Sequence, residues 1–153
     1  MQEPLRVAVY GSLVPGSLTW PSFEKFAAEH QQFDVDTRMM IEGLGSIAGT
    51  LVDLGDFPGL QPGDGRVRAT LLRLLDEDLL ALFDAYEELA TDGGVGYYRN
   101  VVSATLDDFP RSPREAWTYF WRGPIDADRV VPSGDWESHL RSRVVAPPNV
   151  EGL

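Results

Sequence analysis

The sequence predicts one domain that mixes α-helices and β-strands, and three observations support this prediction. The chain has 153 residues, a length typical of a single domain with a sizeable core. Short runs rich in β-branched and aromatic residues alternate with helical patterns along the chain. No long linker, internal repeat or low-complexity block interrupts it. We therefore expect residues 1–153 to form a single domain.

The first part of the chain is predicted to form a strand at residues 5–10 and a helix at residues 21–31. The strand LRVAVY ends at Gly11, and the helix PSFEKFAAEHQ opens with Pro, which is favoured in the first helical turn. Residues 49–54 and 66–75 are the next strand candidates. The segment between them, GDFPGLQPGDG, is rich in Gly and Pro and is therefore expected to form turns.

The clearest helix is predicted at residues 76–90. Its sequence, DEDLLALFDAYEELA, combines helical apolar spacing with three acidic residues in the first turn. Residues 98–106 and 115–122 alternate between apolar and polar side chains, which is typical of strands. Residues 134–143 predict a further helix, which we expect to bury Trp136.

Several side chains on these elements have both a structural and a ligand-binding interpretation. Trp117, Tyr119 and Trp121 share one face of a strand and could stack on a ligand, but the core is the favoured place for them. Arg99 could pair with a carboxylate of a substrate, but pairing with the acidic helix is favoured. His139 is expected to be exposed.

Composition and charge exclude several classes of function. The formal net charge is −11, and the basic residues are scattered singly, so neither nucleic acid nor a polyphosphate ligand is expected. With no Cys and only His30 and His139, a metal site is not expected either. There is no apolar run of membrane-spanning length and no secretory layout at the start. We therefore expect a soluble, cytoplasmic monomer or homodimer without a membrane partner.

The stretch VAVYGSLVPGS, residues 7–17, places two glycines five apart directly after an apolar strand. That spacing is typical of a phosphate-binding loop, but Ser17 stands where such a loop needs Lys. Without the lysine, what remains is a set of backbone N–H groups on a tight turn, which suits one modest anion such as a carboxylate. A plain turn with no ligand is the alternative.

Glu87 is the acidic residue within the helix at residues 76–90 that points partly inward. At about 100° per residue the apolar side chains form one stripe, made up of Leu79, Leu82, Phe83, Tyr86 and Ala90. Glu87 lies on its flank, whereas Glu77, Asp84 and Glu88 project to the polar side. A carboxylate shielded from water has a raised pKa, which suits a general acid or base near neutral pH. A solvated residue at the helix end is the alternative.

These segments follow one another in the order typical of one protein family. VAVYGSLVPG, GTLVDLGDFPGL, LDEDLLALFDAYEE, YYRNVV and VPSGDW occur in that order between Val7 and Trp136. On these motifs the chain resembles the gamma-glutamylcyclotransferase-like family, also called AIG2-like or butirosin-acyl-cyclotransferase-like. The Y-G-S-L loop followed by L-x-x-x-E and then Y-x-R makes the resemblance specific.

The resemblance implies an α+β fold, a small mixed β-barrel with flanking helices. It also implies an enzyme that cleaves γ-glutamyl amides by cyclisation, releasing 5-oxoproline and a free amine. In F-D-A-Y-E, Glu87 matches the family's catalytic glutamate and is expected to be the general acid/base. The residues expected to bind the γ-glutamyl substrate are Tyr10, Gly11, Ser12, Leu13 and Tyr97. Neither a metal, nor a cofactor, nor a covalent nucleophile is expected.

The segment VRATLLRL departs from the family pattern V-x-G-E-L-Y-R-L. Ala69, Thr70 and Leu72 replace its Gly, Glu and Tyr, which predicts a changed substrate pocket. Three hypotheses stay open: a γ-glutamyl cyclotransferase, a tailoring enzyme that removes a γ-glutamyl group from a natural product, and a non-catalytic module that binds a small acid. A serine hydrolase with Ser12 as nucleophile is disfavoured, because Y-G-S-L is not G-x-S-x-G.

Overall fold

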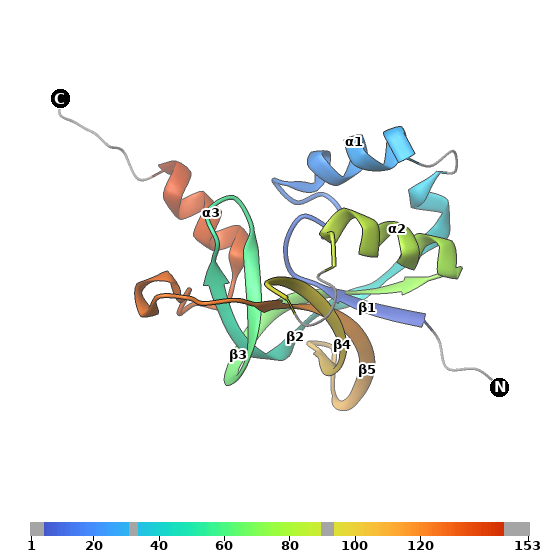
Figure 1. Ribbon diagram of the computed structural model, residues 1–153. Coiled ribbons are helices and arrows are strands. Elements are labelled where there is room, and N and C mark those ends of the chain that lie inside the picture. The colour runs from blue at the N-terminus through green and yellow to red at the C-terminus, as the bar shows by residue number, and fades with distance from the viewer. Residues whose placement is uncertain (1–4, 31–33, 90–93, 146–153) are drawn as a thin grey trace.

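The computed structural model describes residues 5–30, 34–89 and 94–145, and its strands form a closed β-barrel (Figure 1). Around the barrel the strands follow the order β1-β3-β2-β4-β5. They are β1 (Leu5–Val9), β2 (Met39–Asp53), β3 (Pro58–Leu74), β4 (Gly96–Leu106) and β5 (Phe109–Arg122). Neighbouring strands pair antiparallel, except that β1 lies parallel to β5, where Val7 pairs with Trp117. The predicted mixed α+β fold is confirmed.

Within the described residues, three α-helices flank the barrel. α1 (Trp20–His30) and α2 (Glu77–Glu87) lie together beside β1, whereas α3 (Trp136–Val145) lies beside the hairpin of β2 and β3 (Figure 1). Two short 3₁₀ helices, η1 (Val35–Arg38) and η2 (Ala127–Arg129), complete the elements of this part of the chain. None of the described helices has the length and apolar character needed to cross a membrane.

The alternation of side chains along the strands divides the apolar core into two parts. Ala8 of β1 belongs to the core inside the barrel, where Trp136 of α3 is buried as predicted. Val7 and Val9 point to the opposite face of the same strand and join a second core with Phe83 of α2. Helices α1 and α2 are therefore held against the outside of the barrel by β1, the strand that leads into the Y-G-S-L loop.

The hairpin formed by β2 and β3 is longer than predicted. The segment 55–65, which the sequence predicts to be rich in turns, forms a turn at residues 55–57 but a strand from Pro58 onward, and β2 begins at Met39 rather than at residue 49. The end of β2 pairs with this segment, so that Val52 lies opposite Gly59. Pairing with a neighbouring strand overrides the weak strand preference of Gly and Pro. Pro58 stands at the first position of its strand, a place where proline is tolerated.

Helix α2 begins and ends at defined caps. Asp76 Oδ1 accepts a hydrogen bond from the N–H of Leu79 at 3.1 Å, as expected for an N-cap. Glu87 is the last helical residue, and Glu88 adopts a left-handed φ of 52° and donates its N–H to the Ala85 carbonyl at 3.2 Å. The predicted helix ends at residues 31 and 90 lie outside the described residues. The cap thus fixes Glu87 at the C-terminal end of α2.

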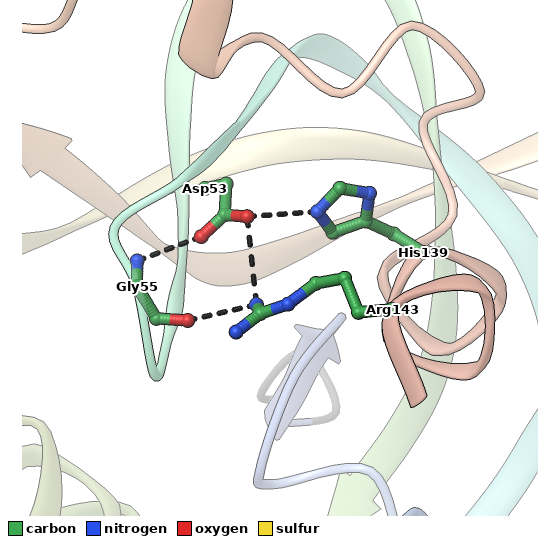
Figure 2. Close-up of polar contacts among 4 residues, drawn as sticks. All are labelled: Asp53, Gly55, His139 and Arg143. Carbon is green, nitrogen blue, oxygen red and sulfur yellow. Dashed lines mark hydrogen bonds and ion pairs between the residues drawn. The ribbon is translucent and has the colours of Figure 1, made fainter. Parts of the chain in front are cut away.

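His139 of α3 is not the exposed residue that the sequence predicts, because Asp53 at the end of β2 binds it (Figure 2). His139 Nε2 lies 2.8 Å from Asp53 Oδ2, while Asp53 Oδ1 accepts the N–H of Gly55 at 2.7 Å. Arg143 donates to the Gly55 carbonyl at 2.9 Å. Burial raises the pKa of Asp53, but the hydrogen bonds from His139 and Gly55 outweigh it and hold the pKa below its usual value. These contacts join α3 to the turn between β2 and β3.

Candidate active site

A small pocket lies where the loop after β1 meets the turn between β2 and β3, the end of α2, and strands β4 and β5. β1 and α2, which lie side by side in Figure 1, both contribute residues to its lining. Its lining includes every residue that the sequence predicts for the site, namely Tyr10, Gly11, Ser12, Leu13, Glu87 and Tyr97. The pocket therefore brings together a loop and a helix end that are far apart in the chain.

The loop after β1, whose residues line this pocket, carries backbone donors that no described residue uses. The N–H groups of Gly11, Ser12 and Leu13 donate no hydrogen bond to any residue that the structure describes. The Gly11 carbonyl accepts the N–H of Val14 at 3.0 Å, which closes the loop into a turn. A Cβ at Gly11 would lie 2.7 Å from Pro58 Cγ, so only glycine lets the loop approach the opposite wall this closely. The loop has the donors that a carboxylate or a carbonyl oxygen would need.

Glu87 combines a place on the pocket wall with a strongly raised pKa. Its side chain is half-buried, and the surrounding protein displaces most of the water that would solvate the carboxylate. This burial, together with the nearby negative charge of Asp84, raises the pKa of Glu87 from 4.5 to about 8. At neutral pH a substantial share of Glu87 is therefore protonated, and the group can both accept and donate a proton in the physiological range.

Three tyrosines surround the same pocket, and each donates its hydroxyl hydrogen to a protein acceptor. Tyr10 donates to the Tyr119 carbonyl, Tyr97 donates to the Pro58 carbonyl, and Tyr119 donates to Asp84 Oδ1 at 2.7 Å. Burial raises the pKa of Tyr10, Tyr97 and Tyr119 well above the ordinary value, so all three stay neutral at physiological pH. Among these lining residues, Glu87 is the one that changes its charge near neutral pH.

Asp84 lies one helical turn before Glu87, and the prediction that it projects to the polar side of the helix is wrong. Its carboxylate receives Arg99 Nε at 2.9 Å and Nη2 at 3.2 Å, in addition to the Tyr119 hydroxyl. Arg99 also stacks over Trp117, with 4.3 Å between its Cζ and the ring centroid. The predicted pairing of Arg99 with the acidic helix is thereby confirmed. Asp84 ties α2 to strands β4 and β5 directly beside Glu87.

Replacing Asp84 by Asn is expected to lower the pKa of Glu87. The substitution removes the negative charge that disfavours ionised Glu87 and leaves the positive charge of Arg99 uncompensated nearby. A side-chain NMR titration of Glu87 should therefore show a midpoint below about 8. Asp78→Asn, an exposed position in the first turn of the same helix, is the matched control and should leave the midpoint in place. A midpoint that stays or rises in Asp84→Asn would show that the charge of Asp84 does not raise the pKa of Glu87.

The sequence does not single out Phe57 and Pro58 as pocket residues, and it favours the core over a ligand contact for Tyr119, although all three line the pocket. For Tyr119 a signal existed, because a tyrosine placed in the core needs a partner for its hydroxyl. Ala69, Thr70 and Leu72, where the chain departs from the family pattern, are buried in β3 rather than on the pocket wall. Thr70 pairs with Val9, which does line the pocket, so Thr70 lies on the neighbouring strand beside that wall.

No group of three or more His, Asp or Glu side chains within residues 5–30, 34–89 and 94–145 is arranged to hold a metal ion. The charged residue that faces the pocket is Glu87. The chemistry available to this site is therefore proton transfer at Glu87 combined with hydrogen bonding by the loop N–H groups.

Comparison with known proteins identifies the family of this chain. The family described as "Gamma-glutamyl cyclotransferase, AIG2-like" matches residues 7–138 of the chain, a range that contains the loop, Glu87 and both of the tyrosines at positions 97 and 119. The chain belongs to this family. The family resemblance inferred from the motifs is thus confirmed.

Relatives of this AIG2-like protein agree in both sequence and fold. The gamma-glutamylcyclotransferase family protein YtfP from Escherichia coli K12 is 30% identical over 134 residues, which covers 86% of this chain and 96% of YtfP. The solution structure of E. coli YtfP superposes with a TM-score of 0.55 over 88% of this chain and 98% of that one. YkqA from Bacillus subtilis has 18% identity and a TM-score of 0.61, covering 95% of this chain and 44% of YkqA, and it shows a likeness of fold alone.

Proposed function

We propose that this AIG2-like protein is a γ-glutamyl cyclotransferase that releases 5-oxoproline and a free amine from a γ-glutamyl amide. One observation carries the proposal. A carboxyl group with a pKa of about 8, Glu87, shares a pocket with the unused N–H groups of Gly11, Ser12 and Leu13. The reaction needs a proton acceptor for an ammonium group and donors for an oxyanion, and these two elements supply both.

In the proposed reaction the substrate's α-ammonium gives one proton to ionised Glu87. The freed α-nitrogen then attacks the γ-carbonyl carbon, and a new C–N bond closes the five-membered ring. Glu87 returns its proton to the leaving nitrogen, and the old amide C–N bond breaks. The α-nitrogen loses its second surplus proton to water, and the released amine takes one up from water. The products are 5-oxoproline and the alkylammonium ion.

We assign to the loop after β1 the role of stabilising the oxyanion that forms on the γ-carbonyl oxygen. Backbone N–H groups that are fixed before the reaction lose little energy in reorienting, so they stabilise developing negative charge effectively. Ring closure is intramolecular, and its rate therefore depends strongly on how the glutamyl chain is held. We assign this positioning to Tyr10, Gly11, Ser12 and Leu13 on one side and to Tyr97 on the other.

A release assay with the purified protein tests the proposal. The protein is incubated with γ-glutamyl amines, γ-glutamyl dipeptides and glutathione, and 5-oxoproline and free amine are both quantified. Equimolar release from at least one class is the expected result. The same chemistry on a larger amine would mark a tailoring enzyme for a natural product. If no compound is turned over but γ-glutamyl ligands still perturb the NMR signals of the loop, the protein is a non-catalytic module and the proposal is overturned.

A further inference from the structure

Phe57 marks the mouth of the pocket. Its side chain is 51% exposed, whereas the other described lining residues are buried or half-buried. Phe57 is therefore the lining residue that presents most of its surface to solvent, while Glu87 and the Gly11–Leu13 loop are more enclosed. A ligand that extends from Glu87 toward solvent therefore has this exposed ring within the same pocket.

The turn that carries Phe57 is held in place by polar contacts within the turn and from α3. Within the turn, the N–H of Leu54 donates to the Phe57 carbonyl at 2.9 Å, and the N–H of Gly55 donates to Asp53 at 2.7 Å. From α3, His139 and Arg143 bind Asp53 and the Gly55 carbonyl, as Figure 2 shows. Gly55 has a φ of +107°, a conformation that only glycine adopts without strain. The backbone next to Phe57 is thus fixed although the ring itself is exposed.

An exposed aromatic ring on a turn that hydrogen bonds keep ordered is preorganised to contact a ligand. Exposing half of a phenyl ring to water is unfavourable, and covering it with apolar carbon atoms recovers that free energy. Because the turn is already ordered, little further conformational entropy is lost when a ligand packs against the ring. Exposed Phe109 on β5 has the same degree of exposure but does not line the pocket, so exposure alone does not give this role.

We infer that Phe57 is a specificity-determining residue that contacts the amine half of the substrate and favours amines with an alkyl or aryl segment next to the nitrogen. The inference rests on the proposed cyclotransferase activity. The glutamyl half has to reach the loop and Glu87, so the amine half, which must leave, points to the mouth where Phe57 lies. Asp53 and His139 act through the turn and are positioning residues for this contact.

Two substrates that differ only in the amine half test the inference, γ-glutamyl-benzylamide and γ-glutamyl-methylamide. Phe57→Ala should lower kcat/KM for the benzylamide by about 5- to 20-fold, the loss expected when one aromatic contact is removed. The loss should appear mainly in KM, because contact with a remote part of the substrate is made before as well as during the reaction. The methylamide should change by less than about twofold, and Phe57→Tyr, which keeps the ring, should restore the benzylamide rate.

Two control variants distinguish the loss of this contact from a general loss of structure or activity. Phe109→Ala removes an equally exposed ring far from the pocket lining and should change neither substrate. Asp53→Asn, which weakens the contact between His139 and the turn that carries Phe57, should raise KM for the benzylamide selectively while kcat stays near its original value. Equal losses on both substrates in Phe57→Ala, or no loss on either, would overturn the inference. If the unaltered protein releases 5-oxoproline from γ-glutamyl dipeptides or glutathione but from neither amide, the inference is overturned while the proposed function stands; release from no γ-glutamyl compound overturns both.

Discussion

The variant Glu87→Gln is expected to lose about 10²- to 10⁴-fold of its 5-oxoproline release, the range typical of a missing general base. Glutamine has the shape of glutamate but cannot accept the proton of the substrate's α-ammonium. In the unaltered protein, kcat/KM should rise with pH as Glu87 ionises around a pKa of about 8, and this rise should be absent from any residual activity of the variant. Steady-state assays of both proteins across this pH range measure the effect.

Two controls accompany this prediction: a binding measurement on Glu87→Gln and a rate measurement on a variant of the neighbouring residue. Glu87→Gln should still bind 5-oxoproline, since the loop N–H groups and Tyr97 are unchanged. Glu88→Gln alters the next residue, which is exposed and does not line the pocket, and it should keep the original rate. Unchanged 5-oxoproline release by Glu87→Gln would show that the base is another group.

The same variant is expected to be more stable than the unaltered protein at alkaline pH. The pKa of Glu87 is raised in the folded state from 4.5 to about 8, so the folded protein binds this proton more tightly than the unfolded chain does. The free energy of unfolding therefore falls as pH rises between these two values, and the loss is complete above the folded pKa. Glutamine does not titrate, so Glu87→Gln escapes this loss, which amounts to a few kcal/mol, on the order of 1.4 kcal/mol per pKa unit.

Urea unfolding of both proteins at a series of pH values tests this expectation. Below the unfolded-state pKa of 4.5 the two proteins should have nearly equal free energies of unfolding, because Glu87 is then protonated in both states. The difference should grow up to a pH of about 8 and then level off. A difference that is independent of pH would mean that burial does not perturb Glu87. Glu88→Gln again provides the comparison with an exposed carboxylate.

The elements that the sequence predicts well are those whose local pattern agrees with their final surroundings. The strand expected at residues 5–10 is β1, and the helix expected at residues 134–143 overlaps α3. In both cases an apolar side chain, such as Val7 or Trp136, faces a core on the side that the pattern indicates. The placement of Glu87 on the flank of its helix likewise agrees with its half-buried state, while its catalytic role stays a prediction.

What the sequence cannot predict depends on contacts between distant segments. The helical pattern assigns Asp84 to the polar side, because nothing local indicates that Arg99 and Tyr119 from two strands cover that side. His139 has its partner Asp53 in a hairpin 86 positions earlier in the chain. Phe57 falls in a segment whose Gly and Pro content indicates turns, although strand pairing begins at the next residue. The single domain spanning 1–153 and the monomer or homodimer state stay predictions.

The parallel contact between β1 and β5 has a consequence for how the protein folds. The Thr118 hydroxyl binds the Ala8 carbonyl at 2.8 Å across 110 positions, and Tyr10 reaches Tyr119 across 109. Contacts of such long sequence separation cost the most chain entropy and are expected to slow the folding reaction. Because the position of the loop that follows β1 depends on this closure, we expect the pocket to form in the step that closes the barrel. Partly folded chains are therefore expected to lack the proposed 5-oxoproline release, and its return during refolding would report the closure of the barrel.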